Sequence, residues 1–90
     1  MKLLLILTCE DIDIFCIQET WIAEGAPAPH IDGFYLIESR RPGNTRGGLI
    51  TYIRKPLKIE TSAVNEYGIF TKIILPNSKR INIINIYIPP

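Results

Sequence analysis

The sequence predicts an α+β fold in which strands predominate. Hydrophobic residues make up 47% of the 90 residues and charged residues 21%, which is typical of a globular chain of one domain at most. Short apolar runs rich in isoleucine and aromatic residues favour strands. The apolar opening, Lys2 to Cys9, is expected to be the end of a helix that leads into the first strand.

The first predicted strand ends abruptly in polar residues. Its apolar side chains, at 12 and 14–17, form the nearly continuous run of a strand covered on both faces. Gln18, Glu19 and Thr20 follow at its carboxyl end, where ligands usually bind in layered α/β folds. A carboxylate on rigid backbone is well placed there to hold a divalent metal beside a phosphate. The alternative is that Glu19 is a solvated loop acid.

The later elements are predicted by branched and aromatic residues, with glycine and proline marking the breaks. Strands are expected at 34–37, 49–54 and 57–60, and then at 67–75 and 80–88 as a hairpin around the turn 76–79. The Pro-rich segment 23–32 and the polar segment 39–48 are expected to be loops.

The charges are divided unevenly along the chain. Residues 1–39 carry one lysine and seven acids, a net charge of −6, whereas residues 40–90 carry nine basic residues and two acids, a net charge of +7. One interpretation is a nucleic-acid partner that meets metal-holding carboxylates on one side and cations on the other. The other is that the two halves pair their charges within the folded chain.

The sequence gives no sign of a membrane or secretory segment. No apolar run approaches the roughly 18 residues that span a bilayer. The run Leu3–Leu7 is too short for the core of a signal peptide, which takes roughly 7–15 residues. Cys9 and Cys16 make no disulfide framework, and a single histidine disfavours zinc. We therefore expect an intracellular protein, with the nucleus as one option.

Three segments, in order, resemble the endonuclease/exonuclease/phosphatase superfamily, which has the pancreatic-deoxyribonuclease-like fold. Residues 13–21 (DIFCIQETW) look like its acidic motif. Residues 33–54 resemble the arginine- and glycine-rich hairpin of its retrotransposon-type members, and residues 83–90 (IINIYIPP) resemble its strand ending in Tyr-x-Pro. Within this superfamily, the three motifs most resemble those of the endonuclease domains of non-LTR retrotransposons.

The resemblance implies a fold and an activity. The fold would be the strand-rich part of a four-layer α/β/β/α sandwich, and the complete domain would hydrolyse DNA phosphodiester bonds with Mg²⁺. Glu19 matches the family's metal-binding glutamate, and Tyr87 matches the active-site tyrosine beside the scissile phosphate. The candidates for nucleic-acid contact are Arg40, Arg41, Arg46 and Arg54, because their planar guanidinium groups suit phosphate oxygens. The alternative is a solvated basic loop.

The chain departs from the family pattern in what it lacks. The family's asparagine-bearing first strand, its Gly-Asp-x-Asn motif and its terminal Ser-Asp-His motif have no counterpart here. Residues 1–90 are therefore expected to be the amino-terminal part of the domain, without measurable cleavage of DNA. They would supply one sheet without its partner, and the uncovered face would favour self-association. The alternatives are a residual nucleic-acid-binding module that uses the arginine loop, and a decayed remnant without function.

Overall fold

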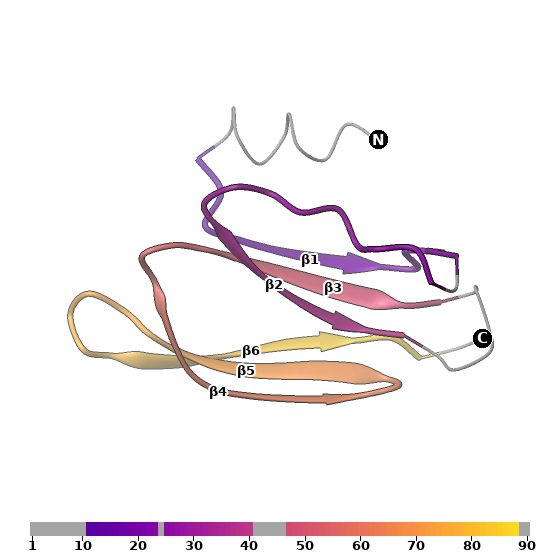
Figure 1. The fold of residues 1–90 in the computed structure, drawn as a ribbon. Helices are drawn as coiled ribbons and strands as arrows, with labels where there is room; N and C mark the ends of the chain where they lie inside the picture. The colour runs from indigo at the N-terminus through magenta and orange to yellow at the C-terminus, as the bar shows by residue number, and fades with distance from the viewer. Residues whose placement is uncertain (1–10, 24, 41–46, 89–90) are drawn as a thin grey trace.

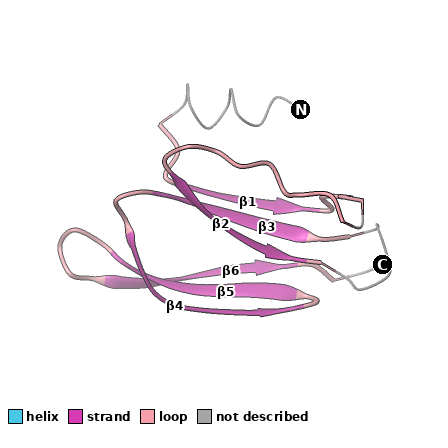
Figure 2. Cartoon of the chain, in the orientation of Figure 1, coloured by secondary structure: helices cyan, strands magenta, loops and turns pink. Residues whose placement is uncertain are grey.

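The computed structural model describes residues 11–23, 25–40 and 47–88, and these residues form two antiparallel sheets of three strands each (Figures 1 and 2). The strands in chain order are β1 (Ile14–Gln18), β2 (Phe34–Ser39), β3 (Leu49–Arg54), β4 (Lys58–Asn65), β5 (Gly68–Ile74) and β6 (Arg80–Ile86). All six were expected from the sequence as strands.

Strand β3 is the centre of the first sheet, whose order is β1-β3-β2. Leu49, its first residue, lies opposite Gln18 of β1 and Ser39 of β2. The second sheet has the order β4-β5-β6 and is formed by sequential hairpins. The two sheets lie one above the other, with β1, β2 and β3 all in contact with strands of the second sheet (Figure 1).

The predicted α+β class is wrong for the described residues, because every regular element in them is a strand. The helix expected at Lys2–Cys9 lies outside these residues, and the four-layer sandwich is replaced by two packed sheets. The expectation of one sheet without a partner is wrong for the same reason. Strands β4–β6 pair with one another through short turns, since such turns bring consecutive strands together, and their sheet covers the first.

Strand β3, at the centre of its sheet, is buried on both of its faces. The sequence predicts such burial for the first strand, and this prediction is wrong: β1 is an edge strand whose residues are only partly buried or exposed, Cys16 among the exposed ones. On the outer face of β3, Ile50 and Tyr52 form a cluster with Ile31 and Phe34, which the loop after β1 and the start of β2 supply. Its alternate residues, such as Ile53, are fully buried on the side of the second sheet. The core therefore has two layers, one between the sheets and one under the loop.

Strand β4 is longer than its prediction, which covered residues 57–60. It runs from Lys58 to Asn65, with a bulge between Ile59 and Thr61 where it pairs with β5. On the second sheet, Phe70 and Ile84 remain exposed, at 38% and 57% of their surface. In the part of the chain that the structure describes, no helix is long and apolar enough to cross a membrane.

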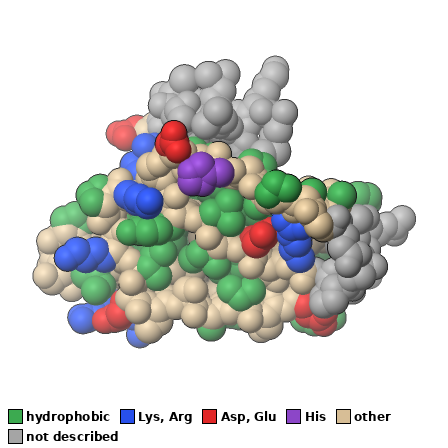
Figure 3. Space-filling model, viewed as in Figure 1, with side chains coloured by type: hydrophobic (Ala, Val, Ile, Leu, Met, Phe, Trp, Pro, Cys, Tyr) green, Lys and Arg blue, Asp and Glu red, His purple; other side chains and the backbone are tan. Residues whose placement is uncertain are grey.

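The folded chain pairs acids of its first half with cations of its second half. The Nε atom of Arg40 lies 2.8 Å from Glu38, and that of Arg54 lies 3.6 Å from Asp13. The face drawn in Figure 3 also shows basic and acidic side chains interspersed among apolar ones. Part of the charge division along the sequence is therefore used inside the molecule.

Candidate functional site

Glu19 and Tyr87 meet at one edge of the molecule, where β1 and β6 end. The Tyr87 hydroxyl donates a hydrogen bond to Oε1 of Glu19, with 2.6 Å between the oxygens. Beside it, the Gln18 side-chain amide donates to the carbonyl of Ile86. These contacts join the carboxyl ends of two strands that belong to different sheets. Two residues that the sequence motifs single out, 68 positions apart, are thus in direct contact.

The backbone around Glu19 forms an unusual turn. Glu19 and Trp21 have φ angles of 54° and 52°, in the left-handed region that non-glycine residues rarely adopt. The amide of Thr20 donates to the carbonyl of Gly48 at 3.4 Å, and that of Trp21 donates to Gly47 at 3.1 Å. Such conformations cost about 1 kcal/mol or more each, and they persist where surrounding contacts hold them. The Gly47-Gly48 backbone supplies those contacts.

Gly48 is required for this arrangement. Its φ is +90°, and a Cβ atom built there would overlap the hydroxyl oxygen of Thr20. The sequence indicates close backbone approach at the Gly47-Gly48 pair. The structure identifies its partner as the turn that carries Glu19.

Asn85 is a buried residue of the site to which sequence reasoning assigns no role. Its side chain is 2% exposed, and its amide Nδ2 approaches the carbonyl oxygens of Ile17 and Ile50 at 3.4 and 3.1 Å and the Thr51 hydroxyl at 3.3 Å. The two carbonyl acceptors fix which end of the amide faces the first sheet. Asn85 therefore ties β6 to β1 and β3, two residues before Tyr87. The sequence offers two signals, a polar side chain in an isoleucine-rich strand and a resemblance of Asn85 to a recurrent position in the family's strand, and neither of them indicates this contact.

The Glu19 carboxylate is exposed and makes no ion pair with another described residue. No group of three or more His, Cys, Asp or Glu side chains that could hold a metal ion occurs within residues 11–23, 25–40 and 47–88. A magnesium ion commonly takes one or two carboxylates and completes its octahedron with water and phosphate oxygens. Glu19 is a suitable first ligand for such an ion.

The predicted nucleic-acid-binding arginines divide into two pairs. Arg40 donates from Nε to Glu38 at 2.8 Å and from Nη1 to the carbonyl of Ala23 at 3.3 Å. Arg54 donates from Nε to the carbonyl of Ile12 at 2.9 Å, and its guanidinium lies 4.5 Å from the centre of the Phe34 ring. Both side chains thus contact the protein itself. Arg41 and Arg46 lie outside the described residues.

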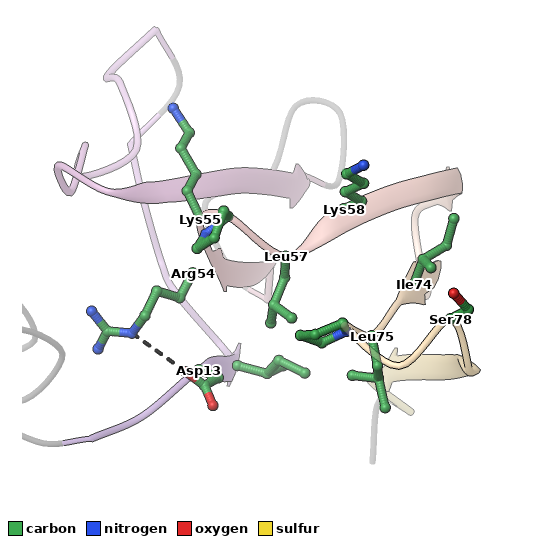
Figure 4. Close-up of a pocket in the computed structure, with 11 residues that line it drawn as sticks. Asp13, Arg54, Lys55, Leu57, Lys58, Ile74, Leu75 and Ser78 are labelled. Atoms are coloured by element: carbon green, nitrogen blue, oxygen red, sulfur yellow. Dashed lines mark ion pairs between the residues drawn. The ribbon is translucent and has the colours of Figure 1, made fainter.

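Arg54 also lies far along the sheet from Glu19. It lines a cavity of about 680 Å³ between the ends of the two sheets, where β1 begins and β3 and β5 end (Figure 4). Asp13, Lys55, Leu57 and Ile74 are among the other lining residues. Glu19 and Tyr87 follow the carboxyl ends of β1 and β6, whereas this cavity lies where β1 begins. The structure therefore does not bring Arg54 and Glu19 together.

The comparisons with known proteins add no relative to these observations. No protein-family model matches the chain, and neither a search of curated proteins nor one of solved structures found a match.

Proposed function

We propose that the edge formed by Glu19 and Tyr87 is part of a metal-dependent phosphodiesterase site of the endonuclease/exonuclease/phosphatase type, which acts on DNA. The observation that carries the proposal is the 2.6 Å hydrogen bond between the Tyr87 hydroxyl and the Glu19 carboxylate. One resemblance nominates both residues, through two motifs that lie at the ends of two separate strands. A solvated loop acid would contact water alone, whereas Glu19 accepts a hydrogen bond from Tyr87.

The chemistry follows from the two side chains. Mg²⁺, when bound, would neutralise phosphate charge and orient the phosphodiester for attack by water. Glu19 would supply one anionic oxygen to the metal. The Tyr87 hydroxyl, held at the same carboxylate, would donate a hydrogen bond either to Glu19 or to a phosphate oxygen beside the metal. The buried amide of Asn85 would hold the two strands in the register that this pair requires.

The strength of metal binding limits the activity we expect. A single carboxylate holds Mg²⁺ weakly, and the described residues form no group of three or more His, Cys, Asp or Glu side chains around it. We therefore propose that these residues bind a divalent ion weakly and do not cleave DNA at a measurable rate. Metal binding, rather than cleavage, is the direct test of the site.

The test uses Mn²⁺ as a paramagnetic substitute for Mg²⁺ in nuclear magnetic resonance spectra of the chain. Amide signals of residues around Glu19 and Tyr87 should broaden first, and excess Mg²⁺ should restore them. Glu19→Gln should remove this local broadening, whereas Asp32→Asn, at an exposed acid before the start of β2 and at the other end of the sheet, should leave it in place. Broadening that is spread equally over the acids, or that survives Glu19→Gln, would contradict the proposal.

Plasmid DNA provides a second readout. Any Mg²⁺-dependent nicking by a preparation of the chain should fall to background in Glu19→Ala. Nicking at an unchanged rate in this variant would mean that Glu19 does not take part in the reaction.

A further inference from the structure

Two exposed aromatic residues flank the Glu19–Tyr87 pair. Trp21 lies two residues after Glu19 and is 53% exposed. Tyr67, in the turn between β4 and β5, is 43% exposed, and its carbonyl accepts a hydrogen bond from the amide of Tyr87 at 2.9 Å. Three segments that are distant in the sequence thus bring Trp21, Tyr67 and Tyr87 to one edge.

Trp21 is the most exposed aromatic residue among those that the structure describes, ahead of Tyr67, Tyr35 and Phe70 at 43%, 40% and 38%. Phe34 and Tyr52 are 4% and 0% exposed and form the cluster on the outer face of the first sheet. Trp21 is the single tryptophan of the chain, and it adopts a φ of 52° that is costly for a bulky residue. Strain of this kind, held beside a candidate site, is a reason to look for a function there.

We propose that Trp21 and Tyr67 stack with unpaired bases, so that the substrate class of the Glu19 edge is single-stranded or locally unpaired nucleic acid. This inference rests on the proposed function. Base–aromatic stacking tolerates any base sequence, because every base has a π face, and each stacked base contributes substantially to affinity. Paired bases inside a duplex do not offer these faces.

The local charges add a condition to this binding. Glu19 and Glu66 are both exposed next to the two aromatic residues, and both would repel a phosphate. A divalent ion at Glu19 would reverse that repulsion at the point where the phosphate lies. Binding of single strands should therefore depend on the divalent ion, as well as on the aromatic rings.

The experiment titrates a ten-residue oligothymidylate into the chain in the presence of Mg²⁺ and follows tryptophan fluorescence. Because Trp21 is the only tryptophan, quenching reports stacking at this position. A dye-labelled copy of the oligonucleotide gives the dissociation constant by fluorescence anisotropy. A hairpin duplex of the same length is the competing ligand, and each titration is repeated with EDTA.

Substitutions distinguish base stacking on Trp21 and Tyr67 from non-specific binding of the oligonucleotide. Trp21→Ala and Tyr67→Ala should each weaken binding by about 5-fold to 100-fold, and Trp21→Phe should restore most of it. Tyr35→Ala is the matched control. Tyr35 lies on β2, away from Glu19, is 40% exposed and has the ammonium group of Lys55 over its ring. Thermal unfolding curves check that each variant is folded.

The outcomes decide between the two proposals. Equal binding of duplex and single strand, or weakening by Tyr35→Ala as large as that by Trp21→Ala, would overturn the stacking inference. So would an unchanged tryptophan signal at saturating oligonucleotide. If Mn²⁺ still broadens the signals around Glu19 in that case, the metal site stands and only the substrate class is wrong. If the Mn²⁺ test fails as well, the proposed function itself is wrong.

Discussion

Gly48 controls the turn that carries Glu19. It combines a φ of +90° with the close approach of the Thr20 hydroxyl, so an alanine there would be both strained and overlapped. We predict that Gly48→Ala destabilises the protein by about 2 kcal/mol or more and also weakens Mn²⁺ binding at Glu19. The measurements are urea unfolding and the paramagnetic broadening described above.

The control for this substitution is Gly33→Ala. Gly33 has a similar φ of +84°, but a Cβ atom there would meet nothing within 4 Å. It should cost only the conformational strain, about 1–2 kcal/mol, with no effect on the metal. Equal losses of stability in the two variants, with Mn²⁺ binding intact in both, would show that the Thr20 contact is unimportant.

Tyr52 links the stability of the fold to alkaline pH. Its ring is fully buried, and its hydroxyl donates to the carbonyl of Pro29 at 2.6 Å. Burial, and secondarily the negative charge of Glu38, raise the pKa of Tyr52 above its ordinary value near 10. The unfolded chain therefore loses this proton at a lower pH than the folded chain does. The stability that Tyr52 contributes is complete below about pH 10 and is lost as the pH rises through its folded pKa.

Tyr52→Phe tests this linkage. The variant should lose about 1 kcal/mol at neutral pH, because the hydrogen bond to Pro29 is absent. Its free energy of unfolding should then fall less steeply than that of the parent above pH 10, in urea titrations at a series of pH values. Parallel curves for the two proteins would contradict the role given to Tyr52.

At the scale of elements, Asn85 joins β6 to the first sheet. Asn85→Ala removes an amide that approaches three acceptors and should cost about 1–3 kcal/mol. We also predict a loss of coupling between Glu19 and Tyr87. In a double-mutant cycle of Glu19→Gln and Tyr87→Phe, the interaction energy measured by urea unfolding should fall toward zero in the Asn85→Ala background.

Asn82 is the matched control for this prediction, since it lies on the same strand and is exposed. Asn82→Ala should leave both stability and coupling near those of the parent. Coupling that persists in the Asn85→Ala background would mean that the Gln18–Ile86 contact alone holds the pair together.

The strands were predictable from the sequence, but their assembly into sheets was not. The apolar run of β1 indicates a strand covered on both faces, but β1 is a partly exposed edge strand and β3 is the buried central one. A local pattern does not encode which strand takes the centre of a sheet, because that depends on pairing with distant strands. The length of β4 was missed because the strand is mostly exposed and its second half, with Thr61, Ser62 and Asn65, lacks apolar alternation.

The candidate site was also predictable only in part: the sequence nominates two of its residues, but not the contacts that hold them. The resemblance nominates Glu19 and Tyr87 together, and the structure brings them into contact. The role of Asn85 depends on carbonyl groups of Ile17 and Ile50, in strands far from it along the chain. No local pattern encodes such a contact. Arg54 likewise carries a charge that the sequence assigns to a partner, whereas the fold directs it to Ile12 and Phe34.

For the whole molecule, the outer face of the β4–β6 sheet is the surface we propose for self-association. Phe70, Ile84 and Ile86 are 38%, 57% and 43% exposed on this sheet, and β4 and β6 are its edge strands. We predict that the chain forms dimers or larger species as its concentration rises, and that Ile84→Lys shifts the equilibrium toward monomer. Sedimentation equilibrium measures both.

Asn82→Lys adds the same charge to an exposed position of the same strand without removing an apolar side chain. It should leave association closer to that of the parent. A chain that remains monomeric at every concentration would exclude this surface as an interface.

The contact between Glu19 and Tyr87 has a consequence for the order of events during synthesis. Glu19 leaves the ribosome 68 residues before Tyr87, so the nascent chain carries the carboxylate without the tyrosine over that interval. The edge is completed only when β6 emerges and Asn85 contacts the sheet formed by the earlier strands. We expect translation intermediates that end before β6 to retain no metal preference at Glu19, whatever structure their earlier strands have formed.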